Sequence, residues 1–284
     1  MNVGIIGLGL MGGSFGRTLV KQGKHKVYAF DINPSVMLKG EMIKAYHEKL
    51  TKENAKEIDM LVVALYPKYF ESAVSEFLPH LKDGAIVSDF CGIKRKVEEQ
   101  MRSLLKGYEN LIFIGGHPMA GREFSGIEKS TTTLFDKASM ILINVNADIF
   151  TMEMVKKFYL EMGFSQVVIT TSSNHDSMIA YTSQLCHIVS NAFIKNKQAQ
   201  SHNGYSAGSY KDLTRVARLE PTMWTELIME NREMVKSELD EFIENLTEYK
   251  KAIDNEDNER LYELLKEGNE RKLSIDAKGF KEQK

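Results

Sequence analysis

The sequence predicts an α/β protein in which a mostly parallel sheet, covered by helices, occupies residues 1–172 and an all-helical domain occupies residues 173–284. Short apolar runs alternate with helical patterns through the first part, and the short connections between them are typical of parallel sheets. After Ser173 the apolar residues recur at helical spacing without the alternation of strands. A chain of 284 residues has room for two such domains.

The first domain contains seven apolar runs with the length and composition of buried strands. Between them lie amphipathic stretches that predict helices, the first of which ends near Gly23. We expect strands at 2–6, 26–30, 60–65, 85–89, 111–114, 139–145 and 166–170, with further helices over 70–78, 97–105 and 148–162.

Composition excludes several classes of protein. The net charge is −2, which favours neither nucleic acid nor an acidic membrane surface as a partner. We find no apolar run of the ~18 residues that a membrane helix needs, and the N-terminus lacks the pattern of a signal peptide. Cys91 and Cys186 lie in apolar segments and have no zinc-ligand spacing. We therefore expect a cytoplasmic protein without a metal.

A glycine-rich turn follows the first strand and opens the first helix. Its residues are Gly7, Leu8, Gly9, Leu10, Met11 and Gly12. Such a turn lets the backbone and the helix N-terminus approach a pyrophosphate. Asp31 ends the second strand, at the distance expected for an acid that binds the adenosine ribose. Its charge would repel a further phosphate, so the pattern predicts a Rossmann-type domain that binds NAD rather than NADP.

Other polar or small residues also follow predicted strands. In open α/β sheets, ligands bind beyond the carboxyl ends of the strands. We therefore expect Leu65, Tyr66 and Gly92 to contact the cofactor. His117 lies in the heptapeptide Gly-Gly-His-Pro-Met-Ala-Gly (115–121), and we expect a turn there, because Pro118 lacks an N–H and glycines flank the histidine.

The second domain is expected to be helical throughout. A helix over 174–195 would be largely buried, with Asn174 as a candidate cap. A long helix from Pro221 carries one apolar stripe to Ile253, and a shorter helix would follow at 257–272, before a frayed end. The stripe predicts a homodimer through this domain, although it could also pack entirely on its own domain.

The sequence resembles the prephenate/arogenate dehydrogenases of tyrosine biosynthesis. The matching stretches are 7–12, the heptapeptide with Glu123, Ser125 and Gly126, His175-Asp176, His187, 211–215 and 221–224. The resemblance implies that prephenate is oxidised by NAD and decarboxylated to hydroxyphenylpyruvate. It further implies that His117 takes the proton of the substrate hydroxyl and that Arg215 binds a substrate carboxylate. His187 would lie near the substrate side chain, and Glu123 at the edge of the pocket.

Two positions depart from the family pattern. Gly92 replaces a serine that contacts the catalytic histidine and the nicotinamide in relatives, so we expect backbone or water to orient His117. Gln184 stands where some members have histidine. No regulatory or mutase domain is expected, so inhibition by tyrosine would act at the active site.

Three alternatives stay open at this point. The substrate could be arogenate, which undergoes the same chemistry with tyrosine as product. A β-hydroxyacid dehydrogenase shares the glycine turn, but it needs a lysine on the interdomain helix, and residues 174–191 contain none. A non-catalytic NAD-binding sensor or scaffold would bind NAD without turning over prephenate.

His187 and Arg215 also have ordinary structural interpretations. His187 could be a buried core residue, and Arg215 could be a surface charge.

Overall fold

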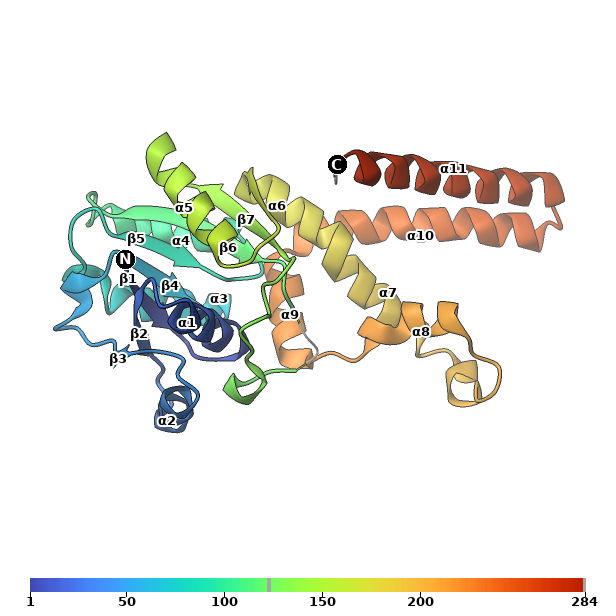
Figure 1. Cartoon of the computed structure of the whole chain (residues 1–284). Coiled ribbons are helices and arrows are strands. Elements are labelled where there is room, and N and C mark those ends of the chain that lie inside the picture. The colour runs from blue at the N-terminus through green and yellow to red at the C-terminus, as the bar shows by residue number, and fades with distance from the viewer. Residues whose placement is uncertain (122–123, 283–284) are drawn as a thin grey trace. The chain divides into compact units, whose positions relative to one another are not determined.

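The structure is a computed structural model and describes residues 1–121 and 124–282. The chain divides into two compact units, Met1–Arg232 and Glu233–Lys284. Figure 1 shows the course of the chain through both units.

An eight-stranded sheet, counted over the described residues, forms the centre of the first unit, in the order β3-β2-β1-β4-β5-β6-β7-β8. Every neighbouring pair is parallel except β6 and β7. The predicted mostly parallel sheet is therefore confirmed. The strands are β1 (Asn2–Ile6), β2 (Lys26–Phe30), β3 (Glu48–Lys49), β4 (Met60–Val63), β5 (Ile86–Asp89), β6 (Ile112–Pro118), β7 (Ser139–Asn144) and β8 (Gln166–Thr170).

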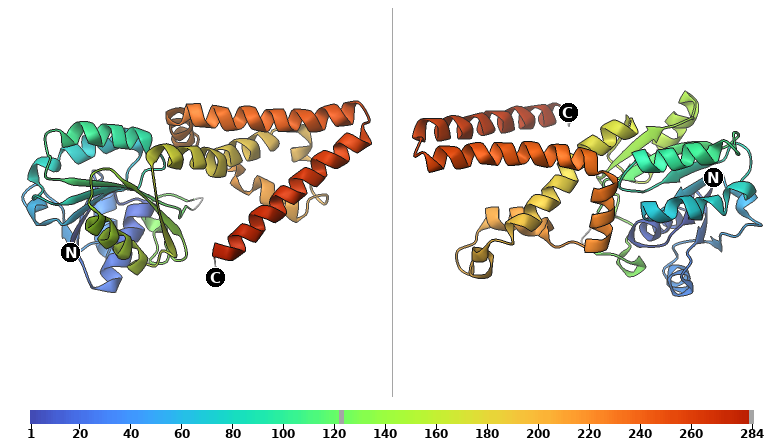
Figure 2. Two further views of the ribbon diagram at one scale, coloured as in Figure 1. Left: turned by 90° about the horizontal axis from the view of Figure 1, so that it is seen from above. Right: turned by 180° about the vertical axis from the view of Figure 1, so that it is seen from behind.

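Helices cover both faces of the sheet (Figure 2). Apolar side chains of α1 (Leu10–Gln22), α2 (Pro34–Met42) and α5 (Ile149–Glu161) share one buried cluster with one face. Those of α3 (Pro67–Ser75) and α4 (Arg95–Leu105) share a second cluster with the other face. Strands buried on both faces must be apolar throughout, which explains their continuous apolar runs. Short 3₁₀ turns complete this part: η1 (Ala55–Glu57), η2 (Leu78–His80) and η3 (Ile127–Lys129).

The expected turn at His117 is wrong, because β6 continues to Pro118 and His117 pairs with Ile141 of the antiparallel strand β7. The strand accommodates Pro118 as its last residue. A Cβ at Gly116 would lie 2.6 Å from the carbonyl oxygen of Asp89, so glycine here permits close strand packing rather than a turn. His117 is therefore held by a rigid strand.

A rod of three helical segments follows the sheet: α6 (Ser172–Ile179), a π-helical turn η4 (Ala180–Leu185) and α7 (Cys186–Phe193). The expected cap at Asn174 is wrong, because the hydroxyl oxygen of Thr171 caps α6 by accepting from the N–H of Asn174. The rod is also less buried than predicted, since Met178 and Tyr181 are exposed. The segments η5 (Lys197–Gln200), α8 (Gly208–Thr214) and η6 (Arg215–Ala217) follow it.

The long helix expected from Pro221 is two helices, α9 (Pro221–Glu230) and α10 (Arg232–Asp254). Asn231 lies between them and is fully buried. Its side-chain amide donates to the carbonyl oxygen of Asp176 at 2.8 Å and to Oε1 of Gln184 at 2.7 Å. The helical periodicity of the sequence does not reveal these tertiary hydrogen bonds at the break.

Helices α10 and α11 (Asn258–Glu282) form an antiparallel hairpin in the second unit (Figure 1). The Tyr249 hydroxyl donates to the carbonyl oxygen of Leu264 at 3.2 Å, and Arg260 pairs with Glu248. The prediction of a shorter last helix and a frayed end is wrong as far as Glu282, because α11 runs for 25 residues, and residues 283–284 lie outside the described residues. Its repeated pairs of opposite charge one turn apart stabilise an exposed helix.

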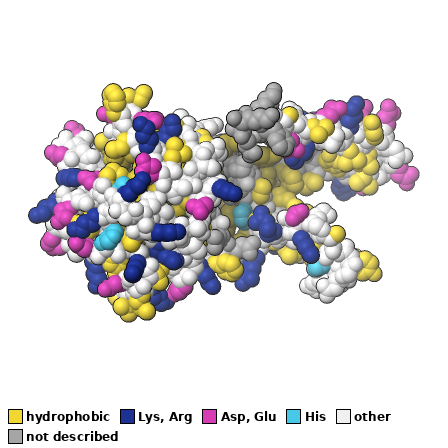
Figure 3. Space-filling model, in the orientation of Figure 1, with side chains coloured by type: hydrophobic (Ala, Val, Ile, Leu, Met, Phe, Trp, Pro, Cys, Tyr) yellow, Lys and Arg dark blue, Asp and Glu magenta, His cyan; other side chains and the backbone are white. Residues whose placement is uncertain are grey.

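Acidic and basic side chains intermingle over the face of the sheet-containing unit that Figure 3 shows. This agrees with the small net charge of −2. Among the described residues, none of the helices has the length and apolar character needed to cross a membrane.

Candidate active site

The turn between β1 and α1 leaves open space where a dinucleotide needs it. Gly7 has φ = 91°, and a Cβ there would lie 2.6 Å from the carbonyl oxygen of Ala64. A Cβ at Gly12 would lie 1.9 Å from the carbonyl oxygen of Gly7, so the helix packs tightly on the turn. At Gly9, by contrast, a Cβ would meet nothing within 4 Å. The turn therefore offers bare backbone and a helix N-terminus without a side-chain cap to a pyrophosphate.

Asp31 connects this turn to the loop after β2. Its Oδ2 accepts from the N–H of Leu8 at 2.8 Å, and its Oδ1 accepts from the N–H of Asn33 at 2.9 Å. Each carboxylate oxygen keeps a lone pair that can accept from a ribose hydroxyl.

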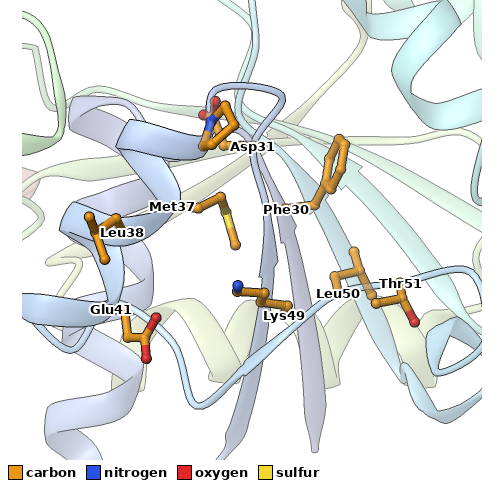
Figure 4. Close-up of a pocket in the computed structure, with 9 residues that line it drawn as sticks. Phe30, Asp31, Met37, Leu38, Glu41, Lys49, Leu50 and Thr51 are labelled. Atoms are coloured by element: carbon orange, nitrogen blue, oxygen red, sulfur yellow. The ribbon is translucent and has the colours of Figure 1, made fainter.

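A hollow of about 360 Å³ opens beside Asp31. Figure 4 shows how its lining residues lie. Asp31 and Glu41 contribute two carboxylates to this hollow and Lys49 one ammonium group, so its net charge disfavours an additional phosphate on the ribose. The rest of the lining is Phe30, Pro34, Met37, Leu38, Leu50 and Thr51.

The other predicted cofactor contacts lie in loops at the carboxyl ends of β4 and β5. A Cβ at Gly7 would touch the Leu65 side chain, so Leu65 packs against the glycine turn. Tyr66 is half exposed at the start of α3. Gly92 faces α9, where a Cβ would lie 3.5 Å from Cδ2 of Leu227, an ordinary contact. No strain therefore requires glycine at position 92.

Hydrogen bonds connect three side chains in series, from His117 through His175 to Asp176. The Nδ1 of His117 lies 2.8 Å from Nε2 of His175, and Nδ1 of His175 lies 2.7 Å from Oδ1 of Asp176. The carboxylate of Asp176 also accepts from the N–H groups of Lys94 at 2.7 Å and Arg95 at 2.9 Å. His175 and Asp176 are both buried, whereas His117 is half-buried. His117 is therefore held by a side chain, and the expectation that only backbone or water would orient it is wrong.

Electrostatics keep the two histidines neutral and the carboxylate charged. Burial lowers the pKa of His117 well below its usual value, and the neighbouring His175 and Lys94 act in the same direction. Burial also lowers the pKa of His175 and outweighs the hydrogen bond that its Nδ1–H donates to Asp176, which raises the pKa. Burial alone would raise the pKa of Asp176, but hydrogen bonds from His175, Arg95 and Lys94 bring it below its usual value.

A buried ion pair supports the strand that carries His117. The Lys94 ammonium group bonds to Asp89 and to the carbonyl oxygen of Gly116, and both charged side chains are almost completely excluded from solvent. Asp89 in turn accepts from the N–H of Gly116 at 3.2 Å and from that of Cys91 at 2.9 Å. The residue before His117 is thus held through both its N–H and its carbonyl oxygen.

His187, Trp224 and Arg215 form a second group. The His187 ring stacks on Trp224 with a centroid distance of 3.8 Å, and its Nδ1 donates to the carbonyl oxygen of Ser183 at 2.9 Å. Burial lowers the pKa of His187, and the nearby positive charge of Arg215 contributes. The Arg215 side chain is exposed, and it forms no hydrogen bond or ion pair with a residue in 1–121 or 124–282.

The π-helical turn brings this second group toward the first. His175 and His187 are twelve residues apart, which in an uninterrupted α-helix would separate their side chains by about 120° around the axis. A π turn holds about one residue more, so the angle falls to about 20°. Helix α9 also joins the groups, because Trp224 packs on His187 and Leu227, one turn later, packs on Gly92.

The sequence predicts functional roles for His117, His187 and Arg215 but none for His175, Asp176 or Lys94. The dipeptide His175-Asp176 just after a helix cap was the available signal. Glu123, predicted at the pocket edge, lies outside the described residues. The described residues contain no cluster of side chains suited to a metal ion.

Comparison with known families and proteins gives matches over almost the whole chain. The family model described as "Prephenate dehydrogenase, nucleotide-binding domain" matches residues 15–168, and "Prephenate dehydrogenase, dimerization domain" matches residues 171–267. A cyclohexadienyl dehydrogenase of Zymomonas mobilis is 27% identical, over 96% of each chain. A prephenate dehydrogenase of Bacillus subtilis is 26% identical, over 92% of this chain and 72% of the relative.

Solved structures of prephenate and arogenate dehydrogenases also match almost the whole chain. The crystal structure of prephenate dehydrogenase from Aquifex aeolicus, in complex with hydroxyphenyl propionate and NAD⁺, is 29% identical with a TM-score of 0.83. The match covers 97% of this chain and 98% of that one. An arogenate dehydrogenase of Synechocystis shares the fold with a TM-score of 0.82 at 23% identity.

Proposed function

The chain belongs to the prephenate dehydrogenase family, and from that premise we propose that it converts prephenate to hydroxyphenylpyruvate by NAD-dependent oxidative decarboxylation. The observation that carries the proposal is the state of His117. Its Nδ1 is engaged by His175, and its Nε2 forms no hydrogen bond with a described residue. A half-buried histidine held in this way is suited to take a proton from a substrate hydroxyl.

NAD is the cofactor of this dehydrogenase, and the residues present fit it. The open space above Gly9 would take the pyrophosphate, and the lone pairs of Asp31 the ribose hydroxyls. When bound, NAD supplies the acceptor for the hydride that leaves the substrate carbon bearing the hydroxyl.

His117 provides the base that this oxidation needs. A carbon that loses hydride becomes a carbonyl only when the proton of its hydroxyl leaves as well. The lowered pKa of His117 keeps its imidazole neutral near pH 7, so the Nε2 lone pair is available for that proton. The oxidised ring then loses its carboxylate as carbon dioxide and becomes aromatic, which makes the overall reaction strongly favourable.

Arg215 and His187 would hold the other end of the substrate. The exposed guanidinium of Arg215 has no partner within the described part of the chain, and its planar donors match a carboxylate in two-point fashion. The stacking of His187 on Trp224 gives its ring a defined orientation. Both would position the substrate without taking part in proton transfer.

Replacement of His117 by Asn tests the proposal. The variant keeps a polar group of similar size but loses the base, so kcat for NADH formation from prephenate should fall roughly 10²- to 10⁴-fold. The Kd for NAD should stay unchanged, because no predicted NAD contact is altered. The matched control is His80→Asn, which changes an exposed histidine on η2. A wild-type rate in His117→Asn would refute the role of His117.

One observation favours a second candidate substrate, arogenate. A carbonyl oxygen only accepts, so the bond to Ser183 places the proton of neutral His187 on Nδ1 and leaves Nε2 as an acceptor. An acceptor suits the ammonium group of arogenate better than the keto oxygen of prephenate. The kcat/KM values for the two substrates, measured side by side at pH 8, would decide between them.

The protein is also proposed to be a homodimer through its helical part. Ile243, Leu246 and Ile253 of α10 are more than half exposed, as are Tyr262, Leu265, Leu273 and Ile275 of α11. Figure 3 shows hydrophobic side chains along this hairpin. Light scattering after gel filtration should give the mass of a dimer. Leu246→Glu should weaken the dimer, whereas Glu244→Gln should not.

The cytoplasmic location and the domain boundary at residue 172 stay predictions, which cell fractionation and limited proteolysis would test.

A further inference from the structure

The hydrogen bonds that lead inward from His117 have a definite direction. A carboxylate only accepts, so Nδ1 of His175 carries the proton in the 2.7 Å bond to Asp176. The Nε2 of a neutral His175 is then an acceptor. Since that atom lies 2.8 Å from Nδ1 of His117, the proton of His117 must lie on Nδ1.

We propose that His175 and Asp176 are positioning residues for the oxidation, because together they fix the tautomer in which Nε2 of His117 carries the lone pair. The inference rests on the proposed function, in which that lone pair takes the hydroxyl proton. In the other tautomer, Nε2 would already carry a hydrogen and could not act as a base. Asp176 sets the direction in which these hydrogen bonds donate, because its carboxylate is the last acceptor in the series. Two backbone N–H groups from the start of α4 hold Asp176 in place.

The same arrangement stabilises the imidazolium that His117 becomes during the reaction. Its Nδ1–H continues to donate to His175, which donates to the charged Asp176. The ammonium group of Lys94 opposes the new positive charge, but Asp89 neutralises it in a buried pair. Arg95 shares the carboxylate of Asp176 at 3.5 Å, so Asp176 compensates the new charge only in part.

Two substitutions of His175 separate its orienting role from its packing role. In His175→Gln, the amide NH₂ of the glutamine must donate to Asp176, because a carboxylate only accepts. The amide oxygen then faces His117 and accepts from its Nδ1–H. In His175→Met, a similar volume remains, but the ring nitrogen is replaced by a thioether sulfur, which is only a weak acceptor. We expect kcat to fall roughly 10²-fold in the methionine variant and less than about 10-fold in the glutamine variant. The Kd for NAD should change less than about threefold in either.

Nitrogen-15 NMR of histidine-labelled protein tests the tautomer directly. In the wild type, the proton of His117 should lie on Nδ1, with Nε2 unprotonated. In His175→Met the resonances should report a mixture of both tautomers, and in His175→Gln the wild-type tautomer. The charge-neutralising Asp176→Asn variant should also shift the acid limb of the kcat/KM profile to lower pH, because the imidazolium of His117 loses a compensating charge.

Several results would overturn the inference: a wild-type kcat in a folded His175→Met variant, equal losses in the methionine and glutamine variants, or a wild-type His117 protonated on Nε2. The NMR measurement needs no substrate. It therefore tests the tautomer even if wild-type protein gave no NADH with prephenate or arogenate, which is the result that would refute the proposed function instead.

Discussion

Replacement of Lys94 by Met should destabilise the first unit more than any comparable surface change. Methionine fills nearly the volume of the lysine stem, so the packing of the methylene groups is preserved. The substitution removes the ammonium group that bonds to Asp89 and to the carbonyl oxygen of Gly116. Both charged side chains are at most 1% exposed, so water cannot replace the lost partner.

The loss in the free energy of unfolding can be estimated from the interactions that Asp89 keeps after Lys94 is replaced. Loss of one partner of a buried ion pair typically costs about 3–5 kcal/mol, because the other charge stays buried without compensation. Asp89 still accepts from the N–H groups of Cys91 and Gly116, which stabilise its charge. We therefore expect a loss at the lower end of that range, about 3 kcal/mol in the free energy of unfolding.

Urea unfolding followed by tryptophan fluorescence measures this loss. Trp224 is the only tryptophan and lies in the first unit, so it reports on the unit that contains Lys94. At about 2–3 kcal/mol per molar urea, the midpoint should fall by about 1–1.5 M. The matched control is Lys82→Met, which breaks the partly exposed pair with Asp59 and should cost at most about 1 kcal/mol. A loss below about 1 kcal/mol in Lys94→Met would refute the reasoning.

Three further predictions concern the cofactor, the substrate and pH. Asp31→Ala should relax the preference for NAD over NADP, measured as the ratio of the two kcat/KM values; an unaltered ratio would reject the role of Asp31. Arg215→Ala should weaken substrate binding by about 1.5–3 kcal/mol, the scale of a charged hydrogen bond, while the nearby exposed Arg218→Ala should not. An unchanged KM would count against Arg215 as the carboxylate ligand. The free energy of unfolding should fall as the pH drops below about 6.5, because the folded state holds the pKa values of His117, His175 and His187 below those of the unfolded chain. Urea unfolding at pH 7.5 and 5.5 checks this, and equal stabilities would contradict it.

The nucleotide-binding part could be predicted from the sequence because its signals are local. The glycines of the turn, the following helix and Asp31 at the end of the next strand lie within about 30 consecutive residues. Their backbone requirements are strict, since Gly7 has a positive φ and Gly12 has no room for a side chain. A local pattern of this kind determines both the fold of the segment and the ligand that it suits.

Helical periodicity was a weaker guide in the second half of the chain. The apolar stripe from Pro221 onward continues across Asn231 without interruption, yet the helix breaks there. The cause is a set of hydrogen bonds to Asp176 and Gln184, which lie about 50 residues earlier in the chain. Similarly, no local signal marks the π turn that rotates His187 toward the face of His175.

The sequence by itself determined that a histidine and an NAD-type turn belong to one sheet, and it named His117. Only the tertiary structure decided how that histidine is held, because its partners come from separate parts of the chain. His175 lies 58 residues away, and the ion pair that supports the strand joins the last residue of β5 to Lys94 in the loop that follows it. The direction of a hydrogen-bond chain depends on the group at its far end, so the tautomer of His117 could be inferred only after folding had placed Asp176 beside His175.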